Sequence, residues 1–118
     1  MRIRPRQLDS LAAGMRSRFA KDIAEHLRDR YADRLTQVSD DSLEKLANRA
    51  IQRSARYNVT LDYDVQRYAE YMVEYGIDFD VHPQTPWASR TLNGNETGTE
   101  KMNALDAFTT FELRRRPA

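Results

Sequence analysis

The sequence predicts an all-α protein, a small four-helix bundle-like domain that occupies residues 1–118. Three observations favour this class. Apolar residues recur every three or four positions in four stretches, helix-capping and helix-ending residues separate these stretches, and no alternating strand pattern competes with them. Four amphipathic helices can bury their apolar faces only against one another. A chain of 118 residues is long enough for one such core and short of a second.

The first predicted helix follows Pro5, because proline is tolerated in the first turn of a helix. Gly14 weakens this helix by about 1 kcal/mol relative to alanine. A connector follows, with Leu35 and Val38 expected to point inward. The inward stripe of the helix is expected to consist of Leu8, Leu11, Met15, Phe19, Ile23, Leu27 and Tyr31.

Ser39 or Asp40 is expected to cap the second helix, and Asn58 is expected to end it in the left-handed conformation. Thr60 is expected to cap the third helix, and Gly76 to end it. Both helices have a continuous apolar face. These faces are expected to be Leu43, Leu46, Ala47, Ala50 and Ile51 in the second helix, and Leu61, Val65, Tyr68, Ala69 and Met72 in the third.

A loop containing two prolines and the only tryptophan, "DFDVHPQTPWASRTL", separates the third helix from the last. Pro83 and Pro86 hold the backbone extended, so that Trp87 can insert into the core and anchor the crossing. The segment "WASRTL" can form a short turn of helix. The loop is therefore interpreted as a strap between helices.

The polar segment at residues 93–99, "NGNETGT", is expected to be flexible. Thr99 with Glu100 is expected to open the last helix, and the basic tail at residues 114–118 follows its C-terminal end. If this helix were detached from the bundle, its apolar stripe would be exposed and would require a partner. That stripe consists of Met102, Leu105, Phe108 and Phe111.

Composition limits the classes of protein that the chain can belong to. The sequence is 40% hydrophobic and 31% charged with a net charge of +1, which is typical of a globular protein. It contains no cysteine, which excludes disulfides, thiolate nucleophiles and cysteine metal sites. It has no signal-peptide core and no apolar run near the roughly 18 residues of a membrane span. A cytoplasmic location is therefore expected.

The patterns that suggest chemistry are weak. Asp78, Asp80 and His82 occupy alternate positions that an extended segment would point to one side, but no second histidine lies nearby to complete a common metal site. His26 is expected to be a surface residue. No phosphate loop, nucleophile elbow or HExxH motif is present, and the paired carboxylates at residues 62/64, 70/74 and 78/80 are typical of surface acids. We therefore expect no enzymatic activity, no cofactor and no metal.

The segment "ANRAIQRSARYNVTLDYDVQRYAEY" allows a helix-turn-helix interpretation. Its recognition helix would begin at Thr60, but residues 60–81 carry six acidic side chains against Arg67 alone. Phosphates repel such a surface. A basic face formed by the first helix and Arg114 to Arg116 could still touch nucleic acid, so this reading stays open as a second alternative.

Aromatic and acidic side chains crowd the third helix and the loop after it, in greater number than one buried helix face can hold. Tyrosine and tryptophan are enriched at binding hot spots because they combine a large contact area with a polar group. We therefore predict a protein-binding surface. Its candidate residues are Tyr63, Asp64, Arg67, Tyr71, Glu74, Asp78, Phe79, Asp80, His82 and Trp87.

Three stretches resemble a group of small helical bacterial proteins encoded beside spike, adaptor and effector genes of type VI secretion systems. They are "RIRPRQLDSLAAGMRSRFAKDIAEHLRDRYADRL", "ANRAIQRSARYNVTLDYDVQRYAEYMVEYGIDFD" and "PWASRTL", and together they fall within residues 2–112. The order "YG-x-DFD" then "PWA" is the specific part. The group usually has Phe-Pro where this chain has Tyr31-Ala32, so the first connector departs from the pattern.

The resemblance implies a contractile-injection context without known catalytic residues. It favours a non-enzymatic accessory factor, adaptor-like or chaperone-like, that binds a secreted effector or a spike component in the bacterial cytoplasm. An immunity protein that occludes a toxin is the first alternative. The identity of the partner, the oligomeric state and the face that binds are left open by the sequence.

Overall fold

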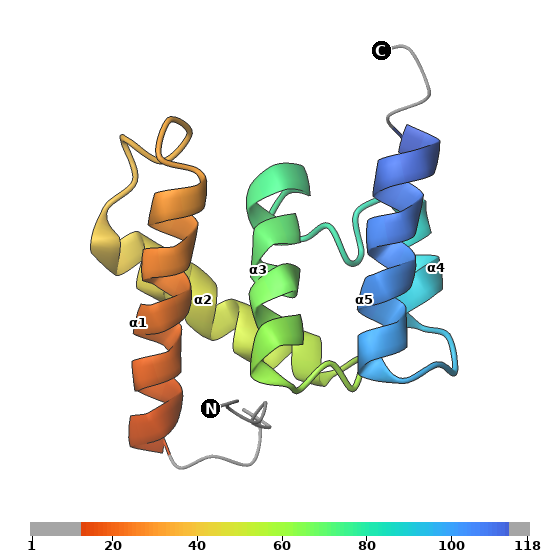
Figure 1. The fold of residues 1–118 in the computed structure, drawn as a ribbon, viewed down its shortest axis with the longest axis horizontal. Coiled ribbons are helices and arrows are strands. Elements are labelled where there is room, and N and C mark those ends of the chain that lie inside the picture. The colour runs from red at the N-terminus through yellow and green to blue at the C-terminus, as the bar shows by residue number, and fades with distance from the viewer. Residues whose placement is uncertain (1–12, 114–118) are drawn as a thin grey trace, which may run out of the picture.

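The computed structural model describes residues 13–113, which form five α-helices joined by connectors (Figure 1). A π-helical turn, η2 (Phe108–Leu113), continues the last of them. The described residues contain no strand, so the all-α prediction is confirmed. The helices are α1 (Ala13–Arg30), α2 (Asp40–Ala55), α3 (Asp62–Tyr75), α4 (Pro86–Leu92) and α5 (Gly98–Ala107).

Helix α3 lies at the centre of the arrangement and touches α1, α2 and α5. Figure 1 shows α1, α3 and α5 standing side by side, with α2 crossing behind α1 and α3. The short helix α4 packs on α5 and lies behind it in this view. The face of α3 opposite α2 is therefore flanked by α1 on one side and by α5 on the other.

Three predicted helix ends agree with the structure. Ser39 is the N-cap of α2, and its hydroxyl accepts a hydrogen bond from the Ser42 amide at 3.1 Å. Asn58 has a φ of 62°, the left-handed conformation that ends a helix. Gly76 follows α3 with a φ of 113°, a conformation that side chains other than glycine rarely adopt.

Two predicted caps are wrong. Leu61, not Thr60, is the N-cap of α3, and its aliphatic side chain has no acceptor for a cap bond; the Asp62 carboxylate accepts the Tyr63 amide at 2.7 Å. Thr97, not Thr99, caps α5. Its hydroxyl accepts the amide of Glu100 at 3.1 Å, and the carboxylate of Glu100 accepts the amide of Thr97 at 2.9 Å. The end of the segment expected to be flexible is thus a reciprocal capping box.

The core lies where α1, α2, α3 and α5 converge. Met102 and Leu105 are fully buried, so α5 packs on its own domain, while Phe111 in the turn beyond it is 62% exposed. Met15 is 42% exposed, so its predicted inward orientation is wrong. Leu8, Leu11 and the tail at residues 114–118 lie outside the described residues. The largest apolar side chains that are fully buried are Leu27, Leu43, Tyr68, Phe79, Leu92, Met102 and Leu105.

None of the helices in the described part of the chain combines the length and the apolar content that a membrane crossing requires.

The start of α5 docks directly on the backbone between α2 and α3. A Cβ atom added to Gly98 would lie 2.2 Å from the carbonyl oxygen of Asn58 and 2.9 Å from the Cα of Val59. The ammonium of Lys101, which is buried, donates a hydrogen bond of 2.9 Å to the carbonyl oxygen of Tyr57. This lysine satisfies a carbonyl just beyond the C-terminal end of α2, where a cation is favoured.

We expect Gly98→Ala to lower the free energy of unfolding by about 1–3 kcal/mol, because the methyl group would overlap backbone atoms that cannot rotate away. Urea denaturation monitored by circular dichroism measures the change. Gly14→Ala is the matched control, since a Cβ at Gly14 meets no atom within 4 Å and alanine favours a helix by up to about 1 kcal/mol. Equal effects of the two substitutions would contradict the close approach.

Candidate functional site

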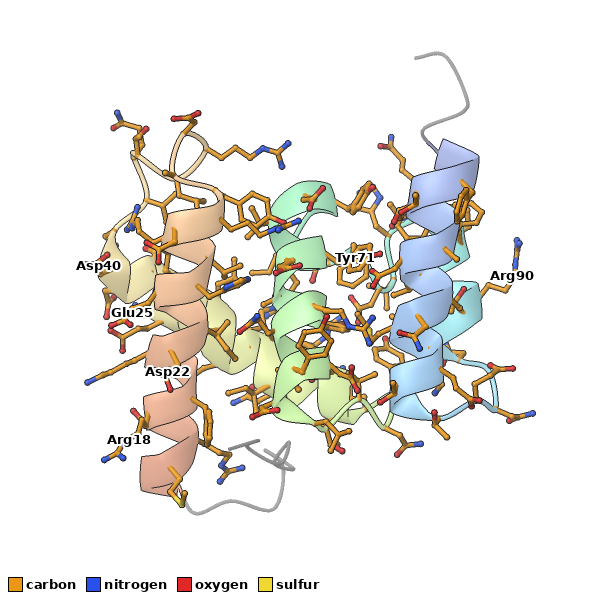
Figure 2. The ribbon with its side chains drawn as sticks, viewed as in Figure 1. Arg18, Asp22, Glu25, Asp40, Tyr71 and Arg90 are labelled. Carbon is orange, nitrogen blue, oxygen red and sulfur yellow. The ribbon has the colours of Figure 1, made fainter. Side chains whose placement is uncertain are left out.

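A cleft of about 500 Å³ lies over the face of α3 that is turned away from α2. Helix α1 forms one wall, and α5 with η2 forms the other. Figure 2 shows Tyr71 pointing into the space between α3 and α5. The lining side chains are His26 and Arg30 from α1, Tyr63, Gln66, Arg67, Glu70, Tyr71, Glu74 and Tyr75 from α3, and Asp106, Thr109 and Thr110 from the last helix.

Helical spacing explains why these side chains converge. Tyr63, Arg67, Glu70 and Glu74 are separated by four, three and four positions, so they share one face of α3. On α1, His26 and Arg30 are four positions apart and face the same cleft. The cleft is therefore built by two helix faces whose polar residues meet across sequence separations that neither helix reveals alone.

Arg67 forms the centre of the wall between α3 and α5. Its guanidinium donates to the Asp64 carboxylate at 2.6 Å, to the Asp106 carboxylate at 2.7 Å and to the Asn103 amide oxygen at 2.9 Å. The second oxygen of Asp64 accepts the Thr99 hydroxyl at 2.5 Å. Burial alone would lower the pKa of Arg67, but the hydrogen bonds to the two carboxylates outweigh it and raise the pKa. This wall is an ordered network with α5 locked to α3.

Tyr71 extends this network into the cleft. Its hydroxyl donates to the Asp106 carboxylate at 2.7 Å and lies 3.1 Å from the hydroxyl of Thr109. Burial, followed by the nearby Asp106 charge, raises the pKa of the Tyr71 hydroxyl, so the group stays protonated as a donor. Behind it, the ring of Trp87 packs against Tyr75 with centroids 5.1 Å apart and stacks on Phe108 at 5.3 Å.

The opposite wall is held by three contacts, which His26 and Arg30 of α1 and Tyr31 just after it make with carboxylates of α3. The His26 ring nitrogen Nε2 lies 2.6 Å from the Glu70 carboxylate, and the Arg30 guanidinium lies 3.8 Å from that carboxylate. The Tyr31 hydroxyl donates to the Glu74 carboxylate at 2.5 Å. Burial and this bond raise the pKa of Tyr31 to about 12. His26 was expected to be a surface residue, but it is half-buried and pairs the two helices.

A second hollow of about 290 Å³ extends the cleft toward the beginning of α3. Tyr63 and Gln66 line both hollows, so the two meet at these residues. The Tyr63 ring is 62% exposed, and the Arg67 guanidinium lies 5.0 Å from its centroid. We refer to the two hollows together as the α1–α3 groove. The second hollow is lined by Phe19, Asp22, Ile23, Asp62, Tyr63 and Gln66.

The loop at residues 76–85 is anchored on α2, away from the groove. The Asp80 carboxylate is fully buried and accepts three bonds of 2.6 to 3.1 Å from the Arg53 guanidinium. The Tyr57 hydroxyl donates to the same carboxylate at 2.7 Å. Beside this pair, the Asp78 carboxylate accepts from Arg49 at 2.8 Å. The aspartates of the loop therefore bind arginines of α2.

The pairing of these aspartates with arginines argues against a metal site formed by Asp78, Asp80 and His82. Asp78 and Asp80 are each engaged by an arginine, and the exposed His82 accepts the Gln84 amide through Nδ1 at 3.0 Å. Within residues 13–113 no group of three histidine, aspartate or glutamate side chains is placed to hold a metal ion. The alternate spacing that the sequence suggested does not bring these three side chains together around one point.

The predicted binding residues separate into distinct places. Tyr63, Arg67, Tyr71 and Glu74 line the groove, and Asp64 lies beneath it as a buried partner of Arg67. Phe79 and Asp80 are fully buried under the loop, so the expectation that the loop displays them is wrong, because one enters the aromatic core and the other pairs with Arg53. Asp78 and His82 are exposed on the far side, and Trp87 is packed against the core.

The groove also contains residues that the sequence did not indicate, namely His26, Arg30, Glu70 and Asp106. Only helical spacing could have suggested that the first two share a face with each other. Their contacts with α3 join positions 44 and 40 residues apart, and no local pattern reports such a pairing.

No family model, no curated protein and no solved structure matches this chain. The groove is therefore interpreted from its own chemistry, which is an ordered set of hydroxyl and guanidinium donors, carboxylate acceptors and an exposed aromatic ring.

We expect Asp80→Asn to destabilise the protein by about 3 kcal/mol at pH 7, because it leaves the Arg53 guanidinium without a charged partner. Burial would raise the pKa of Asp80, but the bonds from Arg53 and Tyr57 outweigh it and lower the pKa. The stabilising contribution is therefore present above an unfolded pKa of about 3.9 and is lost as the pH falls through the folded pKa.

Urea denaturation at pH 7 and at several values below pH 4 checks this. The difference between wild type and Asp80→Asn should shrink as the acid protonates Asp80. Asp78→Asn is the control, since its side chain is 50% exposed and such ion pairs contribute less than about 1 kcal/mol. A difference that stays constant from pH 7 to pH 3 would refute the role given to the Asp80 charge.

We expect Arg67→Met to lower the free energy of unfolding by about 3–5 kcal/mol, because it leaves the buried Asp64 carboxylate without its cation. Adding Asp64→Asn to this variant should restore part of the loss, since no unpaired charge then remains. Thermal and urea denaturation of the single and double variants measures the coupling. Additive losses would argue against Arg67 as the electrostatic centre of the α3–α5 wall.

Proposed function

We propose that the protein is a non-enzymatic accessory factor that binds another protein through the α1–α3 groove. The observation that carries the proposal is the exposure of Tyr63 at the junction of the two hollows, with carboxylates on both sides of it. An exposed tyrosine in a concave surface offers contact area at low conformational cost, as binding hot spots do.

We further propose that the partner is an effector or a spike component of a type VI secretion system, bound in the bacterial cytoplasm before secretion. The sequence resemblance described above supports this context. The ordered walls of the groove support a binding role, because Arg67, Tyr71 and Glu70 are already held in place by their neighbours. A surface held in this way loses little conformational freedom when a partner binds.

In this proposal the fold is a four-helix bundle-like arrangement of α1, α2, α3 and α5, to which α4 is attached. The loop at residues 76–85 acts as the strap between α3 and α4. The bonds from Arg53 to Asp80 and the packing of Trp87 on Phe108 support that role, since they tie the two ends of the crossing to α2 and to the last helix. The strap supports the groove and is not its binding face.

An immunity protein remains the alternative, and the acidic and aromatic character of the groove favours it over the nucleic-acid reading. Such a groove suits the occlusion of a toxin's active site. The face of α3 that would have to enter DNA instead carries Glu70 and Glu74, and phosphates are repelled by carboxylates.

We expect the tagged protein, expressed in its native bacterial host, to co-purify with an effector or spike component. Tyr63→Ala combined with Glu74→Arg should reduce this recovery at least tenfold, because both side chains lie in the groove. Quantitative mass spectrometry measures it. Arg90→Ala is the control, as Arg90 projects outward from α4 (Figure 2). The proposal would be contradicted if Tyr63→Ala with Glu74→Arg left the recovery unchanged, or if no secretion component co-purified.

Co-expression with the recovered effector distinguishes the two roles. A loading factor should alter the secretion or the stability of the effector and leave its toxicity intact. An immunity protein should abolish the toxicity, and Tyr63→Ala with Glu74→Arg should restore it.

A further inference from the structure

The α1–α3 groove has an excess of negative charge. Two arginines, Arg30 and Arg67, and the single histidine His26 face a larger set of acids. Both arginines are engaged, because Arg67 is bonded to Asp64 and Asp106 and Arg30 lies beside Glu70. The carboxylates that line the groove are Asp22, Asp62, Glu70, Glu74 and Asp106.

Three of these carboxylates form no ion pair with any described residue, namely Asp22, Asp62 and Glu74. Asp62 has a local role at the positive end of the α3 dipole, and Glu74 accepts the Tyr31 hydroxyl, but neither contact supplies a cation. Arg18, four positions before Asp22, does not supply one either, since Figure 2 shows it projecting from α1 on the side away from α3.

The unpaired carboxylates mark the two ends of the groove. Asp22 and Asp62 lie at the end where α3 begins, and Glu74 lies at the other end, twelve positions further along α3. A helix rises about 1.5 Å per residue, so these ends are separated by about 18 Å. An extended segment of five or six residues spans this distance. The exposed ring of Tyr63 lies near the first end, where an aliphatic stem or a cation can pack on it.

We propose that the α1–α3 groove binds a lysine- or arginine-bearing segment of the partner protein, with its cations at Asp22 and Asp62 at one end and at Glu74 at the other. This inference rests on the proposed function and adds the chemistry of the partner. Charge complementarity carries it, since carboxylates outnumber cations in the groove and three of them form no ion pair with a described residue; the charge of Arg30 acts on both Glu70 and Glu74. Carboxylates confined to a concave surface raise the local concentration of a cationic partner and its rate of association.

The test uses the full chain and a fluorescein-labelled decalysine peptide, with labelled decaglutamate as the control probe, followed by fluorescence anisotropy. Decalysine should bind and decaglutamate should not. A groove variant carrying Asp22→Asn, Asp62→Asn and Glu74→Gln should bind decalysine at least tenfold more weakly. Thermal denaturation confirms that each variant is folded before its binding is measured.

The matched control variant removes the same number of charges elsewhere, through Glu25→Gln, Asp33→Asn and Glu96→Gln. All three are exposed side chains without an ion pair in the described structure, and Glu25 projects from α1 away from α3 (Figure 2). This variant should change decalysine binding less than twofold. Equal weakening by the two variants, or no binding of decalysine by the unmodified chain, overturns the proposal.

A further arm tests whether the chain itself supplies the cation. Arg2, Arg4 and Arg6 are replaced with glutamine in one full-length variant, and Arg114, Arg115 and Arg116 in another. Tighter decalysine binding by at least tenfold in either variant would identify that segment of the chain as the occupant and overturn the assignment to a partner.

The same groove and control variants, used in the co-purification experiment, separate this inference from the proposed function. If the variant with the three neutralised groove acids fails to recover the secretion component, and the control variant still recovers it, both the inference and the proposed function are supported. Recovery that falls with Tyr63→Ala and Glu74→Arg but is unaffected by neutralising the three acids keeps the function and overturns the cationic partner. If decalysine binds at the groove but no secretion component co-purifies, the inference of a cationic ligand is supported and the proposed function is contradicted.

Discussion

The guanidinium of Arg67 is the electrostatic centre of the contact between α3 and the last helix. It bridges a buried aspartate of its own helix, Asp64, and an aspartate of the last helix, Asp106. Burial makes an unpaired charge at Arg67 or Asp64 costly, so these two groups hold each other in place, and the half-exposed Asp106 adds a second carboxylate from the last helix. Helices α1 and α5 both contact α3 directly, and this bridge orders the wall of the groove between α3 and α5. The ion network that joins the two helices therefore also orders residues that line the groove.

A second network uses the same principle on the opposite side of the domain. Arg53 of α2 and the hydroxyl of Tyr57 satisfy Asp80 within the connection from α3 to α4. The aromatic neighbours Phe79 and Tyr68 bury this region, with ring centroids 5.0 Å apart. One arginine thus fixes the last helix and another fixes the strap that leads to it. The acids of the strap are thus paired with arginines of α2, whereas Asp22, Asp62 and Glu74 of the groove form no ion pair with a described residue.

The helices themselves could be predicted because their information is local. The spacing of apolar residues, the Ser39 cap and the helix ends at Asn58 and Gly76 all depend on residues within about one helical turn of each other. The cap of α5 could also have been predicted, since Thr97 and Glu100 have the threonine-x-x-glutamate spacing of a capping box. Thr99 lacks this spacing because it is adjacent to Glu100. The groove could be predicted only from the α3 side. The partners His26 and Glu70 are 44 residues apart, and Arg53 and Asp80 are 27 apart, so their pairing is set by the packing of whole helices.

The close approach of Gly98 to Asn58 has a consequence for how the domain is assembled during synthesis. Lys101 and the carbonyl of Tyr57, which meet at the same corner, are 44 residues apart, and the entropic cost of closing a loop rises with its length. The pairing of α1 with α2 joins neighbouring segments and needs no such closure. In a chain still emerging from the ribosome, the helix that forms the α1 wall of the groove can therefore pack before α5, which forms the other wall, is available. The site reaches its final shape only when the last helix has been released and has returned to the corner between α2 and α3.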